Sequence, residues 1–197
     1  MSKDELARLE RQWRLSEDAD DERRWFLERL RLGELQQRYE AVLDQFKSDI
    51  AEHDEIPCEP NGLPWQLVFE LFEFESEDLQ SEPLATLEAA LKRRGYKGRV
   101  NAYRELDRSE ALALLSRRCH VTEAYGEVMV PRERAEAAAR DLLALLPTTA
   151  QIYTNVSDSW NTSAFSWSAG LTGHTMDTGL IAHGGVFLLV LWFRDED

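Results

Sequence analysis

The sequence predicts an α+β fold in which N-terminal helices precede two β-α-β units and a C-terminal β-hairpin. Two observations indicate this class. Apolar residues recur at helical spacing over the first fifty residues, and strand-like and helical segments alternate after residue 65. With 43% apolar and 10% aromatic residues, the 197-residue chain has enough hydrophobic side chains for a domain core. We expect a helical segment over 1–50, a linker over 51–64 and an α+β domain over 65–197.

The first fifty residues predict three helices. Leu6, Leu9 and Trp13 recur at the spacing of one helix, and the acidic segment "SEDADDE" is typical of the cap of a second. Gly33 lies where the second helix would end, before a third apolar stripe over 35–50. Because an isolated pair of helices cannot bury the tryptophans, we expect this segment to pack on the rest of the chain or on another chain. The linker "HDEIPCEPNGLP" follows, with three prolines, a glycine and no periodicity.

The first β-α-β unit is predicted over residues 65–106. "WQLVFELFEFE" is strand-like, and the loss of alternation at Leu71–Phe72 indicates a β-bulge or burial of both faces. "SEPLATLEAALKRRG" is typical of a helix, with Ser81 as its cap, Pro83 in its first turn and Gly95 at its end. The second strand, "GRVNAYREL", leads into "DRSEALALLS", whose Asp-x-x-Glu spacing is that of a capping box.

The second β-α-β unit is predicted from the strand "AYGEVMV", the helix "PRERAEAAARDLLALLP" and the strand "AQIYTNV". Two such units in succession favour a ferredoxin-like or related sheet. The chain then closes with "TGLIA", a turn at "HGG" and "GVFLLVLWF". Because the last run is apolar at almost every position, we expect it to be an interior strand of a hairpin.

The distribution of charge favours a basic protein partner. The net charge is −14, and the stretch between Lys47 and Lys92 holds no Lys or Arg, whereas residues 1–50 are nearly balanced. An acidic surface disfavours nucleic acid, whose binding depends on Lys and Arg, and it steers basic proteins toward itself. The alternative is that acidic loops only keep the chain soluble. The candidate partner-binding carboxylates are Asp54, Glu55, Glu70, Glu73, Glu75 and Asp78.

The run from Ser157 to Gly185 allows two functional interpretations. Trp160 and Trp167 stand among Ser, Thr, Asn and Gly, which is typical of a recognition loop with aromatic anchors; both could instead be core residues. The same run could hold a hydrolase triad, although no Gly-x-Ser-x-Gly motif is present. The residues of this candidate centre are Ser166, Ser168, His174 and Asp177.

Motifs for metals, phosphates and export are missing from the sequence. It contains no Cys-x-x-Cys, no His-Glu-x-x-His and no glycine-rich phosphate loop, so we expect no metal and no cofactor. The charged start is not that of a signal peptide, and no apolar run approaches the ~20 residues of a membrane span. We therefore expect a cytoplasmic protein with Cys58 and Cys119 as reduced thiols.

The two β-α-β units, the acidic bias and the end "GLIAHGGVFLLVLWFRDED" together resemble the immunity proteins that bacteria encode beside polymorphic toxins. This resemblance implies a small cytoplasmic α+β protein that covers a toxin's active site and has no catalytic residues of its own. We expect a non-enzymatic inhibitor of a basic toxin or effector. The alternatives are a scaffold or regulatory subunit that self-associates through Trp13, Trp25 and Phe26, and the hydrolase described above.

Overall fold

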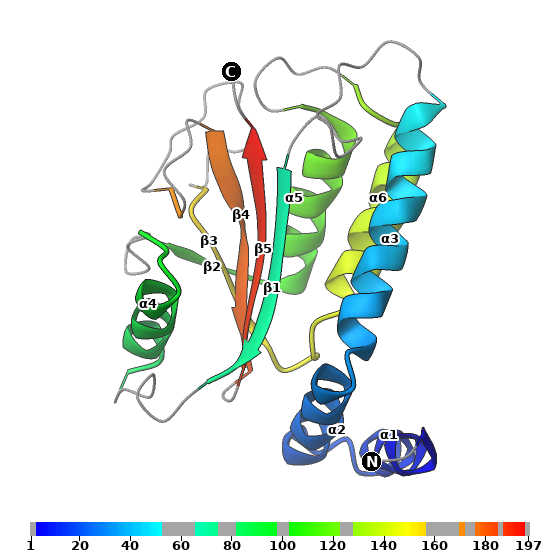
Figure 1. Cartoon of the computed structure of the whole chain (residues 1–197), viewed down its shortest axis with the longest axis vertical. Coiled ribbons are helices and arrows are strands. Elements are labelled where there is room, and N and C mark those ends of the chain that lie inside the picture. The colour runs from blue at the N-terminus through cyan, green and yellow to red at the C-terminus, as the bar shows by residue number, and fades with distance from the viewer. Residues whose placement is uncertain are drawn as a thin grey trace.

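The computed structural model contains a five-stranded antiparallel sheet with helices on both faces, which confirms the predicted α+β class (Figure 1). It describes residues 3–52, 66–74, 82–97, 103–122, 128–156, 170–171, 176–184 and 187–195. The strands are β1 (Gln66–Glu73), β2 (Arg104–Leu106), β3 (Gln151–Thr154), β4 (Met176–His183) and β5 (Phe187–Asp195), and their order across the sheet is β1-β5-β4-β3-β2. The helices are α1 (Lys3–Ser16), α2 (Ala19–Arg31), α3 (Glu34–Ala51), α4 (Pro83–Arg93), α5 (Arg108–His120) and α6 (Arg132–Leu143).

The three predicted N-terminal helices are confirmed. The side chain of Asp18 caps α2 by accepting a hydrogen bond of 2.8 Å from the backbone N–H of Asp20. Gly33, at φ +71°, provides the left-handed turn between α2 and α3. In the hairpin of α1 and α2, the rings of Trp13 and Trp25 stack with centroids 4.8 Å apart.

Helices α2 and α3 pack on the sheet rather than standing apart from it. Phe26 of α2 is buried against Phe187 of β5, with ring centroids 4.4 Å apart. Tyr39 of α3 stacks on Phe69 of β1 at 3.9 Å. Phe26 is therefore not available to another chain, contrary to the scaffold alternative. The predicted linker lies almost entirely outside the described residues, so the domain boundaries stay a prediction.

Strand β1 has partly buried apolar side chains on both faces and has no bulge. Its pairing with β5 is continuous from Gln66↔Arg194 to Glu73↔Phe187, so the bulge allowed by the sequence is absent from this strand. The lost alternation has the other predicted cause, because apolar side chains of β1 pack on each face of the sheet. Those facing the α5–α6 side are Leu67, Phe69 and Leu71, and those facing α4 are Val68 and Phe72.

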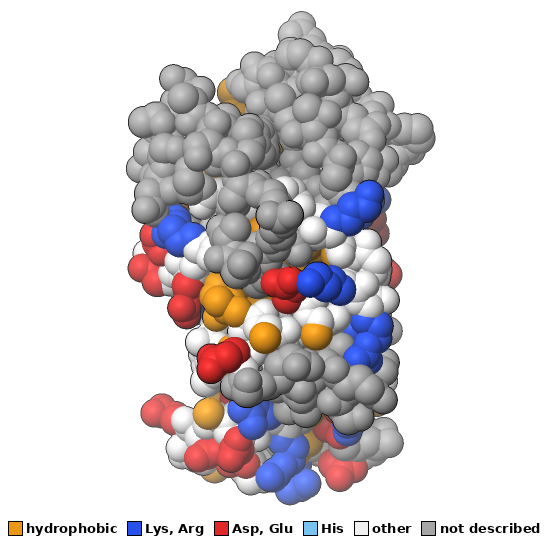
Figure 2. All heavy atoms as spheres, turned by 90° about the vertical axis from the view of Figure 1, so that its left-hand side faces the viewer, with side chains coloured by type: hydrophobic (Ala, Val, Ile, Leu, Met, Phe, Trp, Pro, Cys, Tyr) orange, Lys and Arg blue, Asp and Glu red, His pale blue; other side chains and the backbone are white. Residues whose placement is uncertain are grey.

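The helices lie in two layers, one on each face of the sheet. Figure 1 shows α3, α5 and α6 on one face and α4 on the other. Seen from the α4 side, the described acidic and basic side chains are interspersed (Figure 2). This face, as far as the structure describes it, therefore carries no large patch of one sign.

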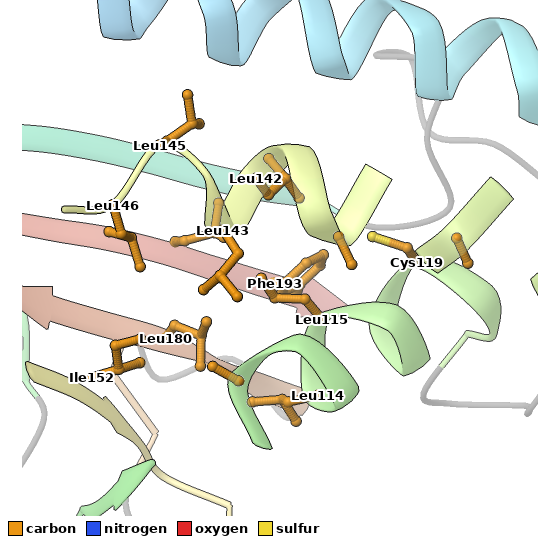
Figure 3. Packing of buried hydrophobic residues seen from close by; sticks show 14 of the residues in the cluster. Leu114, Leu115, Cys119, Leu142, Leu143, Leu145, Leu146, Ile152, Leu180 and Phe193 are labelled. Atoms are coloured by element: carbon orange, nitrogen blue, oxygen red, sulfur yellow. The ribbon is translucent and has the colours of Figure 1, made fainter. Parts of the chain in front are cut away.

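The larger core cluster lies between the sheet and the α5–α6 pair (Figure 3). Leu115 of α5 and Leu143 of α6 converge there on Leu180 and Phe193 of the two neighbouring strands. Cys119 is a buried free thiol in this cluster, and burial raises its pKa to about 12, so it stays protonated and unreactive. Cys58 lies outside the described residues.

Local signals in the sequence correctly predicted α4 and α5. Pro83 occupies the first turn of α4, and Gly95 follows the helix at φ +85°. The N-cap of α4 is Glu82, without a side-chain hydrogen bond, and Ser81 lies outside the described residues. The capping box of α5 is formed by Asp107 and Glu110.

The predicted second β-α-β unit is not observed, and a ferredoxin-like arrangement is not confirmed. Within the described part of the predicted strand 124–130, Val128 forms only an isolated bridge with Val121. The N–H of Met129 donates to the carbonyl of His120 at 2.8 Å, so the described part of this connection closes on the end of α5. Helix α5 is therefore followed by α6 in a helical hairpin. The first pair of strands also differs, because β1 and β2 lie at opposite edges.

The C-terminal hairpin is confirmed. Strands β4 and β5 pair from Met176↔Asp195 to His183↔Leu188, and Gly184 lies at the turn. Strand β5 has β1 on one side and β4 on the other, so it is the interior strand that its continuous apolar run predicts.

Candidate functional site

Two of the predicted partner-binding carboxylates lie on an edge strand of the sheet. Glu70 and Glu73 are exposed on β1, whose other side pairs with β5. Because their separation is odd, the two side chains point to opposite faces of the sheet. Glu70 forms no ion pair with another described residue. We call β1 with these two carboxylates the acidic edge.

Glu73 binds a cation of the chain itself. Nη2 of Arg31 in α2 donates to both carboxylate oxygens, at 3.0 and 3.2 Å. Hydrogen bonds to Glu73 and then to Glu28 raise the pKa of Arg31. The contact is solvent-exposed, and exposed ion pairs contribute little to stability. Glu73 can therefore exchange this contact for a partner's cation at small cost.

Most of the other predicted site residues are not among the described residues. Those that lie outside the described residues are Asp54, Glu55, Glu75, Asp78, Trp160, Trp167, Ser166, Ser168 and His174. Asp177 lies in β4 opposite Arg194, and only its backbone is described. The hydrolase alternative therefore stays an untested prediction.

The described part of the chain contains no cluster of three or more His, Cys, Asp or Glu side chains placed to hold a metal ion. None of its helices is long and apolar enough to cross a membrane.

Among the described residues of the Ser157–Gly185 run, His183 has a shifted pKa. It was predicted to belong to the turn but is the last residue of β4, paired with Leu188, and its ring lies parallel to that of Tyr153 at 6.4 Å. The side chain is 8% exposed, and burial lowers its pKa below the ordinary value of 6.5. His183 is therefore neutral in the folded protein at neutral pH.

Stability should fall between about pH 7.5 and pH 5.5 because of His183. The folded-state pKa is below 6.5, so the unfolded chain binds the proton more readily once the pH drops through that value. Urea unfolding across this range should show the loss in the parent protein and a flatter profile in His183→Gln. Comparing the two proteins cancels the contributions of the other titrating groups. Parallel profiles would contradict this assignment.

The structure also contains a cleft that the sequence interpretation missed. It lies between α5 and α6 and has a volume of about 510 Å³. On its α5 side, three of the six lining residues are small; the six are Ser109, Leu112, Ala113, Ser116, Arg117 and His120. Its α6 side has the charged row Arg132, Glu136 and Arg140. We call this feature the α5–α6 cleft.

Charge in the α5–α6 cleft has the opposite sign to that of the chain. Among the described residues that line it, three are arginines and one, Glu136, carries a carboxylate. Nε of Arg132 donates to Glu136 at 2.9 Å, and Nη2 of Arg140 lies 4.0 Å from the other carboxylate oxygen. The cleft thus carries a cationic excess in a protein of net charge −14.

The sequence of α6 contains a pattern that indicates one side of this cleft. Arg132, Glu136 and Arg140 recur every four residues, which places them on one face of a helix. Because a strand of the sheet was predicted at 124–130, between α5 and α6, the two helices were not expected to pack against each other. Once the two helices are recognised as a hairpin, their facing rows define a groove.

In comparisons with known proteins, no family model matches the chain, and neither a curated protein nor a solved structure matches it. Function is therefore inferred from the residues themselves.

Proposed function

We propose that this chain is a non-enzymatic protein-binding module that inhibits a basic toxin or effector by covering it, as bacterial immunity proteins do. One observation carries the proposal: exposed Glu70 and Glu73 lie on an edge strand within a stretch, 48–91, that has no Lys or Arg. Such a surface attracts cationic side chains, and a partner's Lys or Arg would replace Arg31 at Glu73.

The acidic edge suits contact with a second protein in two respects. Carboxylates on both faces of β1 can reach cations on either side of the strand. The strand is also regular over eight residues and has β5 on one side, and no other described strand pairs with its outer side, where a partner's strand could add backbone hydrogen bonds. Trp160 and Trp167 are proposed to anchor the contact, and the proposed compartment is the cytoplasm.

Affinity capture from the native lysate tests the proposal by isolating the protein that binds this chain. The tagged protein is loaded at low salt and washed at rising salt, because electrostatic contacts weaken as screening increases. We expect a basic protein that elutes with salt and whose toxic or enzymatic activity is suppressed by the purified chain. Binding without suppression of that activity would identify a partner but would contradict the proposed inhibitory function.

Charge reversal at the acidic edge should slow association with that partner. For Glu70→Lys with Glu73→Lys we expect an association rate at least ~10-fold lower at low salt, and a smaller effect at high salt. The matched control is Glu105→Lys with Asp141→Lys, which makes the same change in net charge at exposed positions on β2 and α6. Stopped-flow fluorescence measures both rates. Equal slowing by the two pairs would mean that only net charge matters, not the edge.

Self-association through the N-terminal helices is the second proposal, and Leu15 of α1, at 88% exposed, favours it. Deleting residues 1–50 cannot test it, because Tyr39, Phe46 and Ile50 of α3 belong to the main core cluster. A variant lacking residues 1–17 keeps that core. Its mass in solution, compared with that of the full chain by light scattering, tests whether α1 mediates assembly.

A further inference from the structure

We propose that the α5–α6 cleft binds an acidic helix of a second protein, with carboxylates of that helix on Arg132 and Arg140. This site is separate from the acidic edge and does not depend on the function proposed for it. Its ligand has the opposite charge to the partner expected at β1.

The shape of the cleft fits a helix. Two adjacent antiparallel helices leave a groove along their length, and a third helix packs into such a groove. From Ser109 to His120 the α5 row extends about 16 Å at the helical rise of ~1.5 Å per residue. Small side chains at Ser109, Ala113 and Ser116 let a helix approach closely. The Ser116 hydroxyl already donates to the carbonyl of Leu112 at 2.7 Å, so burying it leaves no unpaired donor.

The charges in the cleft are placed at both of its ends. Because α5 and α6 run antiparallel, Arg117 and His120 at the end of α5 lie near Arg132 at the start of α6. Nδ1 of His120 is 2.7 Å from the carbonyl of Val130, which holds its ring at this end. Arg140 lies two helical turns further along α6 from Arg132. An occupant therefore needs carboxylates about two helical turns apart on one face.

The stability of α6 does not explain why a cation, Arg132, stands at the start of this helix. Cations in the last turn of a helix are favourable, which accounts for Arg117 and Arg140 without a ligand. Arg132 instead lies in the first turn of α6, where the helix dipole disfavours a cation. Its pairing with Glu136 also has the weaker orientation, with the base N-terminal to the acid. An external carboxylate supplies the missing favourable interaction.

Glu136 is the one acidic side chain among the described residues that line the cleft. It accepts from Arg132 and approaches Arg140, so a single carboxylate is shared by two guanidinium groups. Each arginine retains N–H donors beyond these contacts, since a guanidinium has five. Side-chain exposures of 81% for Arg132 and 60% for Arg140 leave those donors accessible to an incoming helix.

Fluorescence anisotropy with a labelled peptide tests the proposal. The probe is a helical Ala/Glu peptide of about 16 residues with its carboxylates on one face, and its counterpart has Gln in place of Glu. We expect the full chain to bind the Glu peptide at least ~10-fold more tightly than the Gln peptide, and Arg132→Gln with Arg140→Gln to lose at least ~10-fold. The matched control, Arg8→Gln with Arg23→Gln, removes the same charge from α1 and α2 and should stay within ~2-fold.

Three outcomes would overturn the proposal. Equal binding of the two peptides removes the role of the carboxylates. Equal loss in the cleft and control variants shows that net charge alone attracts the probe. Tighter binding of inorganic polyphosphate, with the same dependence on Arg132 and Arg140, assigns the cleft to a phosphate polymer instead of a protein. Circular dichroism of each variant confirms that it is folded before binding is measured.

Discussion

Gly179→Ala should lower the free energy of unfolding by about 3 kcal/mol or more, which is at the upper end for overpacking a buried site. Gly179 lies in β4 directly opposite Trp192 of β5, and both residues are buried. A Cβ atom on Gly179 would lie 2.7 Å from the Cα of Trp192 and would overlap the carbonyl oxygen of Leu191. Both obstructing atoms belong to the backbone of an interior strand, so neither can move aside as a side chain would. Urea unfolding measures the change.

A double variant identifies which atoms cause the loss. The Trp192 ring also lies close, with Cε3 at 3.0 Å from the built Cβ. If the backbone contacts dominate, Gly179→Ala in a Trp192→Leu background should cost nearly as much as it does alone. Full rescue in that background would assign the clash to the indole, and an unchanged single variant would contradict the close packing altogether.

Glu22→Ala should lower the free energy of unfolding by about 2 to 3 kcal/mol. Glu22 of α2 is 1% exposed, and its carboxylate accepts hydrogen bonds from the turn after α6. The backbone N–H and hydroxyl of Thr148 donate at 2.8 and 2.9 Å, and the hydroxyl of Thr149 donates at 2.9 Å. Alanine removes these charge-assisted bonds and leaves a void where the carboxylate was.

Two variants control this prediction. Glu22→Gln keeps one acceptor oxygen and should lose less stability than Glu22→Ala. Glu40→Ala, at an exposed position of α3, should change stability by no more than ~0.5 kcal/mol. Urea unfolding at constant pH compares all three. If Glu22→Ala and Glu40→Ala are alike, the carboxylate does not join α2 to the α6–β3 turn.

Features set by neighbouring residues were predictable from the sequence. The Asp107–Glu110 capping box, Gly33 between two helices and Gly95 after α4 depend only on local geometry. The same holds for the β4–β5 hairpin, where a short turn joins two apolar runs. Each of these elements is determined by residues that lie close together in the sequence.

Features set by distant residues were not predictable. Nothing near β1 in the sequence indicates that it pairs with β5, the last strand of the chain. The segment 124–130 has the alternation of a strand, yet its described part closes on α5 through the Met129–His120 hydrogen bond. The α5–α6 cleft follows from that connection, so it could not be inferred while a strand was expected there. Of the candidate site, Glu70 and Glu73 were correctly placed on a strand, but their position at a sheet edge required the sheet order.

Hydrogen exchange of the β1 amides, with and without the captured basic partner, tests the central claim most directly. The amides of 66–73 that do not pair with β5 should exchange quickly in the free protein and more slowly in the complex. Exchange in β2, at the opposite edge, should not change. Slower exchange confined to other elements, with β1 unaltered, would contradict the claim that the partner is bound at the acidic edge.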